Sequence, residues 1–186
     1  MAETKIGIVG ATGDLGSGLA LRWAAAGLPV ILGSRSPERA EAAKDELLQR
    51  VPGADVSAAD NAGAAAGADV VVVSVPFAAQ EAILASIRDG CRGKIVLDVT
   101  VPLEPGDPTR PARVPEGSAA QRSQQLLGPE ARVVAGLHTI AASLLANLDH
   151  ELAADALICG DDAAAKQVIA DLVARIGLRP IDCGPL

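Results

Sequence analysis

The chain has 186 residues, enough for one domain with a sizeable hydrophobic core. Hydrophobic residues make up 49% of it and charged residues 21%, which is a globular composition. A formal net charge of -7 argues against a general nucleic-acid-binding role, which requires a basic face. Trp23 and Phe77 are the only aromatic residues, so the sequence also lacks the stacking platforms of a single-strand binder.

The cysteines and the N-terminus indicate a cytoplasmic protein. Cys91, Cys159 and Cys183 are odd in number and form no C-x-x-C pair, so we expect reduced thiols rather than disulfides or a metal site. The start, MAETKIGIVG, lacks the basic region and the long apolar region of a signal peptide. The apolar runs are too short to span a bilayer, so no membrane association is expected.

Short aliphatic runs alternate with helix-like segments along the chain, and several runs lack polar alternation, as expected of strands covered on both faces. This series predicts an α/β fold: a Rossmann-type doubly wound, mainly parallel sheet in a single domain over residues 1–186. The predicted strands are Lys5–Val9, Val30–Leu32, Asp55–Ala58 (the weakest), Val70–Val75, Lys94–Val99, Arg132–Ala135, Ala156–Cys159 and Arg179–Asp182. The predicted helices are Asp14–Ala26, Pro37–Leu48, Asn61–Ala66, Ala79–Arg88, Ser118–Leu127, Ser143–Asn147 and Asp162–Ile176.

The first strand and helix enclose a glycine turn, within KIGIVGATGDLGSGLALRWAAAG. Gly10 lets the chain leave the strand sharply, Gly13 lets the backbone approach a pyrophosphate, and Gly16 lets the helix pack closely on the sheet. Free N–H groups near Gly13–Leu15 then face the anion. The alternative is a tight strand-to-helix turn without a ligand. The position between a clear strand and a clear helix favours dinucleotide binding.

The end of the second strand indicates which dinucleotide is bound. NAD enzymes usually place an acid there to hold the ribose 2′-hydroxyl, whereas this chain reads ILGSRSPERA. Ser34 and Arg35 stand at the strand end, and Arg39 follows one helical turn later. Arginine forks suit a 2′-phosphate, so we predict NADP(H). The alternative is that both arginines are solvated charges beside a helix cap, which Ser36-Pro37-Glu38 predicts.

Two later stretches bear on the rest of the crevice. In VVVSVPFAAQ, Pro76 ends the fourth strand and turns the chain over the crevice, while Phe77 either caps the nicotinamide side or fills the core. Residues Val101–Gly117 contain five prolines, and we expect them to form a long irregular loop that serves as a lid or rim.

With GATGDLG, GSRSPERA and SVPF in view, AGLHTIAASLLANLD (Ala135–Asp149), ICGDD and GLRPIDCGPL are the more specific motifs. Together they resemble the NADPH-dependent coenzyme F420 reductases, or F420H2:NADP oxidoreductases, over essentially the whole chain. The resemblance implies hydride transfer between the nicotinamide of NADP(H) and coenzyme F420, an 8-hydroxy-5-deazaflavin. It also implies a homodimer whose deazaflavin site lies at the C-terminal ends of the strands.

The resemblance assigns site residues position by position. Thr12, Gly13, Asp14 and Leu15 match the pyrophosphate turn; Ser34, Arg35 and Arg39 match the 2′-phosphate pocket; Val75 and Pro76 match the nucleotide crevice; His138 and Ala142 match positions beside the nicotinamide; Val101 and Pro102 match a loop near the deazaflavin. We expect His138 to act by position and charge rather than as an obligate acid, the alternative being a core histidine after the sixth strand.

Two departures from the family pattern stand out. Asp14 replaces the asparagine expected in the turn. The chain also ends at Leu186, whereas family members are expected to continue with a further helical segment that helps to form the dimer and the deazaflavin site. The sequence is either shortened or that of a minimal member. The other functions that remain are an NADPH-dependent reductase of a flavin, ferric ion or imine, and a non-catalytic NADP(H)-sensing module.

Overall fold

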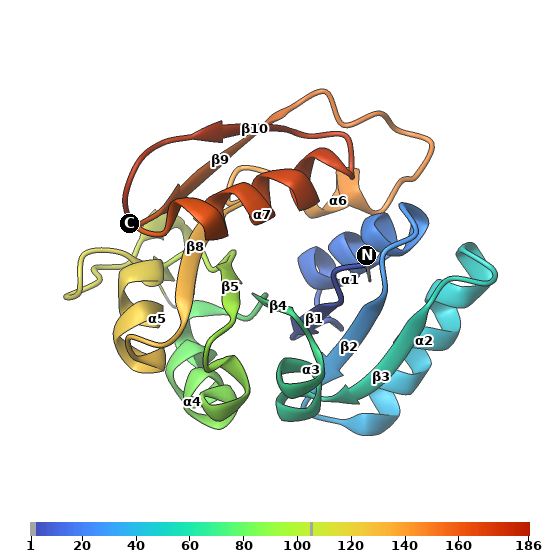
Figure 1. The fold of residues 1–186 in the computed structure, drawn as a ribbon, viewed down its shortest axis with the longest axis horizontal. Coiled ribbons are helices and arrows are strands. Elements are labelled where there is room, and N and C mark those ends of the chain that lie inside the picture. The colour runs from blue at the N-terminus through green and yellow to red at the C-terminus, as the bar shows by residue number, and fades with distance from the viewer. Residues whose placement is uncertain (1–2, 105) are drawn as a thin grey trace.

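The computed structural model describes residues 3–104 and 106–186 (Figure 1). Within them, the main sheet has eight strands in the order β10-β9-β8-β5-β4-β1-β2-β3. Its strands are β1 (Ile6–Val9), β2 (Val30–Ser34), β3 (Val56–Asp60), β4 (Val70–Val73), β5 (Ile95–Asp98), β8 (Arg132–Gly136), β9 (Asp155–Gly160) and β10 (Arg179–Asp182). The helices are α1 (Asp14–Ala25), α2 (Pro37–Arg50), α3 (Asn61–Gly67), α4 (Phe77–Ile87), α5 (Ala119–Leu127), α6 (Ala142–Leu145) and α7 (Ala163–Ala174), with a short 3-10 turn η1 (Asp89–Cys91).

Helices cover both faces of the sheet, and alternate strand residues enter two separate cores. Ile8 and Val72 pack on the side of α1, α2, α6 and α7, where Trp23 is fully buried. Val71 and Val73 pack on the side of α3, α4 and α5. The Trp23 indole N–H donates to the carbonyl of Leu172 at 2.9 Å and so joins α1 to α7. Because the central strands β1 and β4 are covered on both faces, their sequences read as continuous apolar runs, whereas β9 alternates buried and more exposed residues.

The predicted α/β architecture is confirmed: the sheet is doubly wound and mainly parallel, with every predicted strand and helix present. Most boundaries move by one or two residues, because helix and strand ends carry weaker signals than their interiors. The predicted cap of α2 is also confirmed, since Ser36 accepts a hydrogen bond from the Arg39 N–H. Strand β9 is the exception to parallel pairing, because it runs antiparallel to β8 while β10 follows it in parallel.

One expectation about the proline-rich stretch Val101–Gly117 is wrong. Instead of an entirely irregular loop, the chain forms a small antiparallel hairpin of β6 (Leu103–Glu104) and β7 (Asp107–Pro111). Both strands of a two-stranded sheet are edge strands, where prolines are tolerated because their missing N–H groups face outward. Pro105, one of the five prolines, lies outside the described residues.

Candidate active site

The predicted site residues come from five strands that end at the same edge of the sheet. Strands β2, β1, β4, β5 and β8 are mutually parallel, so their C-terminal ends lie together. Gly10 follows β1, Ser34 ends β2, Val75 follows β4, Val101 follows β5 and His138 follows β8. In an open α/β sheet this edge is where ligands bind.

Two of the three glycines of the turn, Gly10 and Gly16, have no room for a Cβ. Gly10 has a φ of 81°, and a Cβ on it would lie 2.4 Å from the Ser74 carbonyl oxygen. A Cβ on Gly16 would lie 2.8 Å from the Gly10 carbonyl oxygen. Asn61, at the start of α3, accepts the Gly10 N–H at 3.2 Å and fixes the turn from the neighbouring loop. Gly13 is the N-cap of α1. Because Gly13 has no side chain, the unpaired N–H groups of the first helical turn are accessible to a bound anion.

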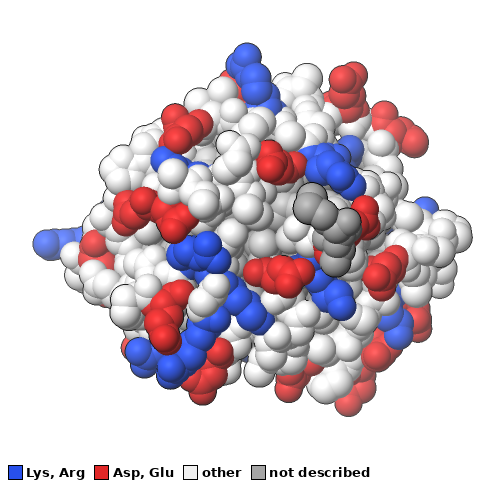
Figure 2. All heavy atoms as spheres, viewed as in Figure 1, with Lys and Arg blue, Asp and Glu red and all other residues white. Residues whose placement is uncertain are grey.

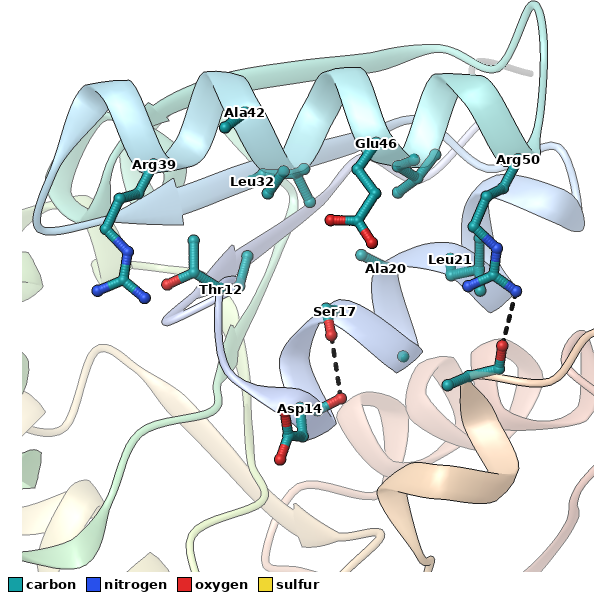
Figure 3. A pocket seen from close by; sticks show the side chains of 15 residues that line it. Thr12, Asp14, Ser17, Ala20, Leu21, Leu32, Arg39, Ala42, Glu46 and Arg50 are labelled. Carbon is teal, nitrogen blue, oxygen red and sulfur yellow. Dashed lines mark hydrogen bonds between the residues drawn. The ribbon is translucent and has the colours of Figure 1, made fainter.

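A pocket of about 460 Å³ between α1 and α2 contains three of the predicted residues. Thr12 and Asp14 enter it from the start of α1, and Arg39 enters it from α2. Figure 3 shows the Arg39 guanidinium directed toward the Thr12 hydroxyl, with the Glu46 carboxylate further along the pocket and Arg50 at the far end. The end formed by Thr12 and Arg39 therefore combines a hydroxyl, a guanidinium and a helix N-terminus, which together suit a phosphate.

The turn between β2 and α2 places the other two residues of the predicted 2′-phosphate pocket. Ser34 is buried, and its Oγ accepts the Ser36 N–H at 3.3 Å. Arg35 is exposed and follows it directly. Glu38 also lies in this turn, and a hydrogen bond from the Ser36 hydroxyl at 2.6 Å lowers the pKa of the Glu38 carboxyl. Two arginines therefore share this surface with one ionised acid.

The exit of β4 forms the opposite side of the glycine turn. Val75 is half-buried, and its Cγ1 would lie 2.9 Å from a Cβ placed on Gly10. Pro76 is exposed and is the N-cap of α4. The half-buried Phe77 ring packs under Arg122 of α5, whose Cζ lies 5.3 Å from the ring centroid. Phe77 therefore forms a cation–π contact that joins α4 to α5. This contact was not among the two roles considered from the sequence, which were capping the nicotinamide and filling the core.

The segment after β5 presents apolar side chains to solvent at the same edge. Val101 is 40% exposed and Leu103 37% exposed. Pro102 is half-buried, and its carbonyl accepts the Ala112 N–H at 2.9 Å, which closes the base of the β6–β7 hairpin. An apolar, exposed rim at a ligand edge provides a wall on which a flat ring system can lie.

The segment after β8 carries the predicted catalytic histidine. Leu137 has a φ of 65° and is the one non-glycine residue with positive φ among residues 3–104 and 106–186. Its side chain is buried in the core, while His138 is exposed. A bulky residue in the left-handed region is strained, and such strain marks functional sites. The strained link anchors Leu137 inward and turns His138 outward, so the alternative of a core histidine is not supported.

Burial favours the neutral form of the His138 imidazole. Enough protein surrounds the ring to lower its pKa from the ordinary value of 6.5, and the negative charge of Asp98 opposes this effect. Ala142, four residues further on, is half-buried and begins α6. His138 and Ala142 therefore belong to one short segment that crosses the edge of the sheet.

A buried polar cluster beneath this edge was not predicted. Asp98, the last residue of β5, is fully buried; its Oδ2 accepts from Gln80 of α4 at 3.0 Å and from Ser123 of α5, and its Oδ1 accepts the Thr100 N–H at 2.8 Å. The one available signal was an acid at the end of an apolar strand in KIVLDVT. Its partners are 18 and 25 residues away, so no local pattern reveals them.

Acidic and basic side chains are interspersed on the face drawn in Figure 2. Within residues 3–104 and 106–186, no group of three or more His, Cys, Asp or Glu side chains is placed to hold a metal ion. In the same residues no helix has the length and apolar character needed to cross a membrane.

The bare glycine turn and the arginine pocket, on a doubly wound parallel sheet, define a Rossmann-type dinucleotide-binding protein.

Comparisons with known proteins give the family. The family model "NADP oxidoreductase coenzyme F420-dependent" matches residues 5–102, and the chain belongs to this family. An F420-dependent NADP reductase of Methanothermobacter thermautotrophicus is 43% identical over 189 residues, covering 98% of this chain and 82% of the relative. One of Methanocaldococcus jannaschii is 40% identical over 190 residues, covering 98% and 84%. A crystal structure of a candidate F420-dependent NADP reductase from Arthrobacter sp. FB24 superposes with a TM-score of 0.82 at 31% identity, covering 98% and 85%.

Proposed function

We propose that this protein transfers a hydride between NADP(H) and coenzyme F420. The observation that carries the proposal is similarity over 98% of the chain to relatives named F420-dependent NADP reductase. The edge formed by β1, β2, β4, β5 and β8 supports it, because the residues assigned to NADP(H) and those assigned to the deazaflavin follow strands that end at this same edge.

The NADP(H) half is assigned to the first part of the chain. The close packing around Gly10 and Gly16 holds the turn in place, and the bare backbone of Gly13, where a Cβ would meet only the Gly10 carbonyl oxygen at 3.6 Å, is where a pyrophosphate would approach. First-turn N–H groups of α1, near Gly13, Asp14 and Leu15, would bind the pyrophosphate together with the Thr12 hydroxyl. Arg35 and Arg39, beside the buried Ser34, would bind the 2′-phosphate, and Val75 and Pro76 would flank the nucleotide. We assign the preference for NADP(H) over NAD(H) to the two arginines.

The deazaflavin half is assigned to the segment that follows β5, where Val101 and Pro102 would provide an apolar wall. His138 and Ala142, in the segment that follows β8, would lie beside the nicotinamide that meets the deazaflavin. The nicotinamide and deazaflavin rings supply the hydride donor and acceptor when bound, which is chemistry that no side chain here provides. The protein's task is to hold two flat rings in contact and to exclude water between them.

His138 would act by position and electrostatics rather than as an obligate acid. Burial lowers the pKa of the imidazole and so favours its neutral form, in which one ring nitrogen is a donor and the other an acceptor. A neutral imidazole can orient a polar ring substituent by hydrogen bonding. It also leaves no positive charge to oppose the positive nicotinamide formed when NADPH gives up a hydride.

The direct test follows NADPH oxidation by absorbance with purified coenzyme F420 as the acceptor. We expect turnover with the deazaflavin and none with FMN, ferric citrate or a cyclic imine supplied at the same concentration. Turnover with one of those acceptors alone would replace the proposed function by that reductase activity. NADPH binding without turnover on any of them would instead support a sensing module.

As part of the same proposal, two copies of the chain associate, and the protein works in the cytoplasm. Leu144 and Leu157 are 41% and 46% exposed, so large apolar side chains are available at the surface. Cys91, Cys159 and Cys183 are all unpaired, as expected in a reducing compartment. Light scattering coupled to gel filtration tests the dimer, and a mass of a single chain at micromolar concentration contradicts it.

A further inference from the structure

Arg22 is a buried charge in an otherwise apolar stretch of α1, within LALRWAAAG, and only 8% of it is exposed. Among the described residues it forms no ion pair; its guanidinium donates to main-chain carbonyl oxygens instead. Burial lowers the pKa of Arg22 below its usual value, yet a guanidinium remains protonated in proteins. A buried charge of this kind is retained only where several polar groups satisfy it.

The carbonyl groups that satisfy Arg22 lie more than 120 residues away. Its Nε donates to the Leu145 oxygen at 3.1 Å, and its Nη2 donates to the oxygens of Leu144 at 3.0 Å and His150 at 2.8 Å, and to that of Asn147. These carbonyls belong to the C-terminal end of α6 and the turn after it. The Leu144 and Asn147 oxygens also accept the main-chain N–H groups of Asn147 and His150, and the Arg22 guanidinium adds donors to a group of carbonyls where a cation is favourable.

Two further residues hold the same segment in place. Gly18, one turn before Arg22 on the same face of α1, leaves room for α6: a Cβ there would lie 2.7 Å from the Leu145 Cβ. From α2, Arg50 donates to the Ala146 carbonyl oxygen at 2.7 Å, the dashed line beside Arg50 in Figure 3. Residues 142–150 are thus fixed to two helices of the NADP(H) half.

Helix α1 connects this attachment to the glycine turn. Gly13 caps the helix and Gly18 lies five residues further on, about 7.5 Å along the axis at 1.5 Å per residue. On the other side, the attached segment continues directly into His138 and the strained Leu137. The distance from the glycine turn to His138 and Ala142 is therefore set through one rigid helix.

We propose that Arg22 is a positioning residue for hydride transfer: it holds the segment with His138 and Ala142 at a fixed place relative to the bound dinucleotide. This inference rests on the proposed function. Arg22 itself lies behind the segment, hydrogen-bonded to its main chain, and acts through it.

The test compares three variants. Arg22→Met keeps an apolar stem and removes every donor. Arg22→Lys keeps the charge but replaces the planar fork by a single ammonium group. Arg175→Met is the matched control, because Arg175 also donates to a main-chain oxygen, that of Ala26 at 3.2 Å, but is exposed and lies at the C-cap of α7.

The first measurement is hydrogen exchange of the protein without cofactors. Amides of Leu144, Ala146 and His150 are hydrogen-bonded within the segment. We expect them to exchange roughly tenfold faster or more in Arg22→Met, less so in Arg22→Lys, and unchanged in Arg175→Met, with the amides of β1 unaffected in all three.

The second measurement separates binding from transfer. In Arg22→Met the NADP dissociation constant should change less than about twofold. The single-turnover hydride transfer rate per folded molecule should fall about ten- to hundredfold, because the segment with His138 and Ala142 would no longer hold the reacting rings in the productive geometry. Arg22→Lys should lie between this variant and the wild type. An unchanged transfer rate per folded molecule, or unchanged exchange of residues 142–150, overturns the inference.

Two further results have to be considered: a variant that does not fold, and a wild-type protein that does not transfer hydride to F420. If Arg22→Met does not fold, Arg22→Lys decides, and parallel loss of protection in β1 and in residues 142–150 means that Arg22 serves global stability only, which overturns the proposal. If the wild-type protein transfers no hydride to F420, the proposed function fails, and the exchange comparison alone decides whether Arg22 holds the segment.

Discussion

The side-chain amide of Gln80 donates to Oδ2 of Asp98 at 3.0 Å, and neither residue is exposed to solvent. This contact joins the first turns of α4, which follow the nucleotide side of the site, to the end of β5, which leads to Val101 and Pro102. Ser123 adds α5 to the same carboxylate. One buried acid therefore connects β5, which leads to Val101 and Pro102, with α4, which follows Val75 and Pro76, and with the supporting helix α5.

Replacing Asp98 by asparagine should destabilise the protein by about 1–3 kcal/mol, because an amide NH₂ would face the donors of Gln80 and Ser123 inside the core. Urea denaturation followed by circular dichroism measures the change. Asp89→Asn is the control, since Asp89 is exposed and pairs only with the surface residue Arg92. If the two substitutions lower the free energy of unfolding equally, the buried cluster around Asp98 stabilises the protein no more than a surface ion pair does.

The same Asp98→Asn variant should lower the pKa of His138. In the wild-type protein burial lowers this pKa and the charge of Asp98 partly raises it, so removing the charge leaves burial unopposed. The chain has two histidines, so their imidazole carbon-bound protons are readily followed by NMR during a pH titration. A His138 pKa that stays constant or rises contradicts the electrostatic coupling.

The lowered pKa of His138 also predicts a pH-dependent stability. Because the folded protein binds this proton less readily than the unfolded chain, the free energy of unfolding rises with pH in this range. The contribution is fully present above the unfolded value of about 6.5 and is lost as the pH falls through 6.5 toward the folded pKa. His138→Gln should therefore lose less stability than wild type between pH 7 and pH 5 in urea titrations. Identical slopes would mean that His138 is not desolvated.

Removing either arginine at the β2–α2 turn should weaken NADP binding selectively. Loss of a charge-assisted hydrogen bond is worth about 1.5–3 kcal/mol, or roughly ten- to hundredfold in Kd. Calorimetric titration of Arg35→Ala and Arg39→Ala with NADP and with NAD measures this. Arg92→Ala carries the same change in charge far from the site and should bind both nucleotides as wild type does. Equal weakening of NADP and NAD would refute the assignment of the 2′-phosphate pocket.

The three thiols should react at very different rates with a disulfide reagent at pH 8. Burial raises the pKa of Cys91 to about 11, so almost none of its reactive thiolate is present. Cys183 is exposed and Cys159 is half-buried, with its pKa also raised by burial. We expect Cys183 to react first, Cys159 more slowly and Cys91 only after unfolding, as mass spectrometry of the labelled peptides can show. Early labelling of Cys91 would contradict its burial.

The sequence predicts most of the scaffold because its signals are local. An apolar run, a glycine turn and the Ser36 cap define β1, α1 and the start of α2 within a few residues each. Strand direction has no such signal, so the antiparallel β9 could not be read from its residues. The β6–β7 hairpin was missed because prolines exclude interior strands but not edge strands.

The predicted site residues fall at one edge of the sheet for the same reason: each follows a recognisable strand. What supports them could not be predicted, because the contacts of Asp98 and Arg22 join residues 18 to 128 positions apart. A buried acid and a buried arginine in apolar stretches are visible in the sequence, but only the tertiary structure supplies their partners. Such residues are worth marking as anchors whenever an apolar strand or helix contains one.

The separate hairpin of β6 and β7 gives the protein a region that can diverge on its own. In the described residues these strands pair with each other and not with the main sheet. Substitutions there leave the register of the eight main strands and the glycine turn unchanged. A library of variants substituted only within residues 103–111 would therefore change the apolar rim next to Val101 and leave the residues assigned to NADP(H) binding unaltered. Variants that prefer other hydride acceptors could then be selected from it.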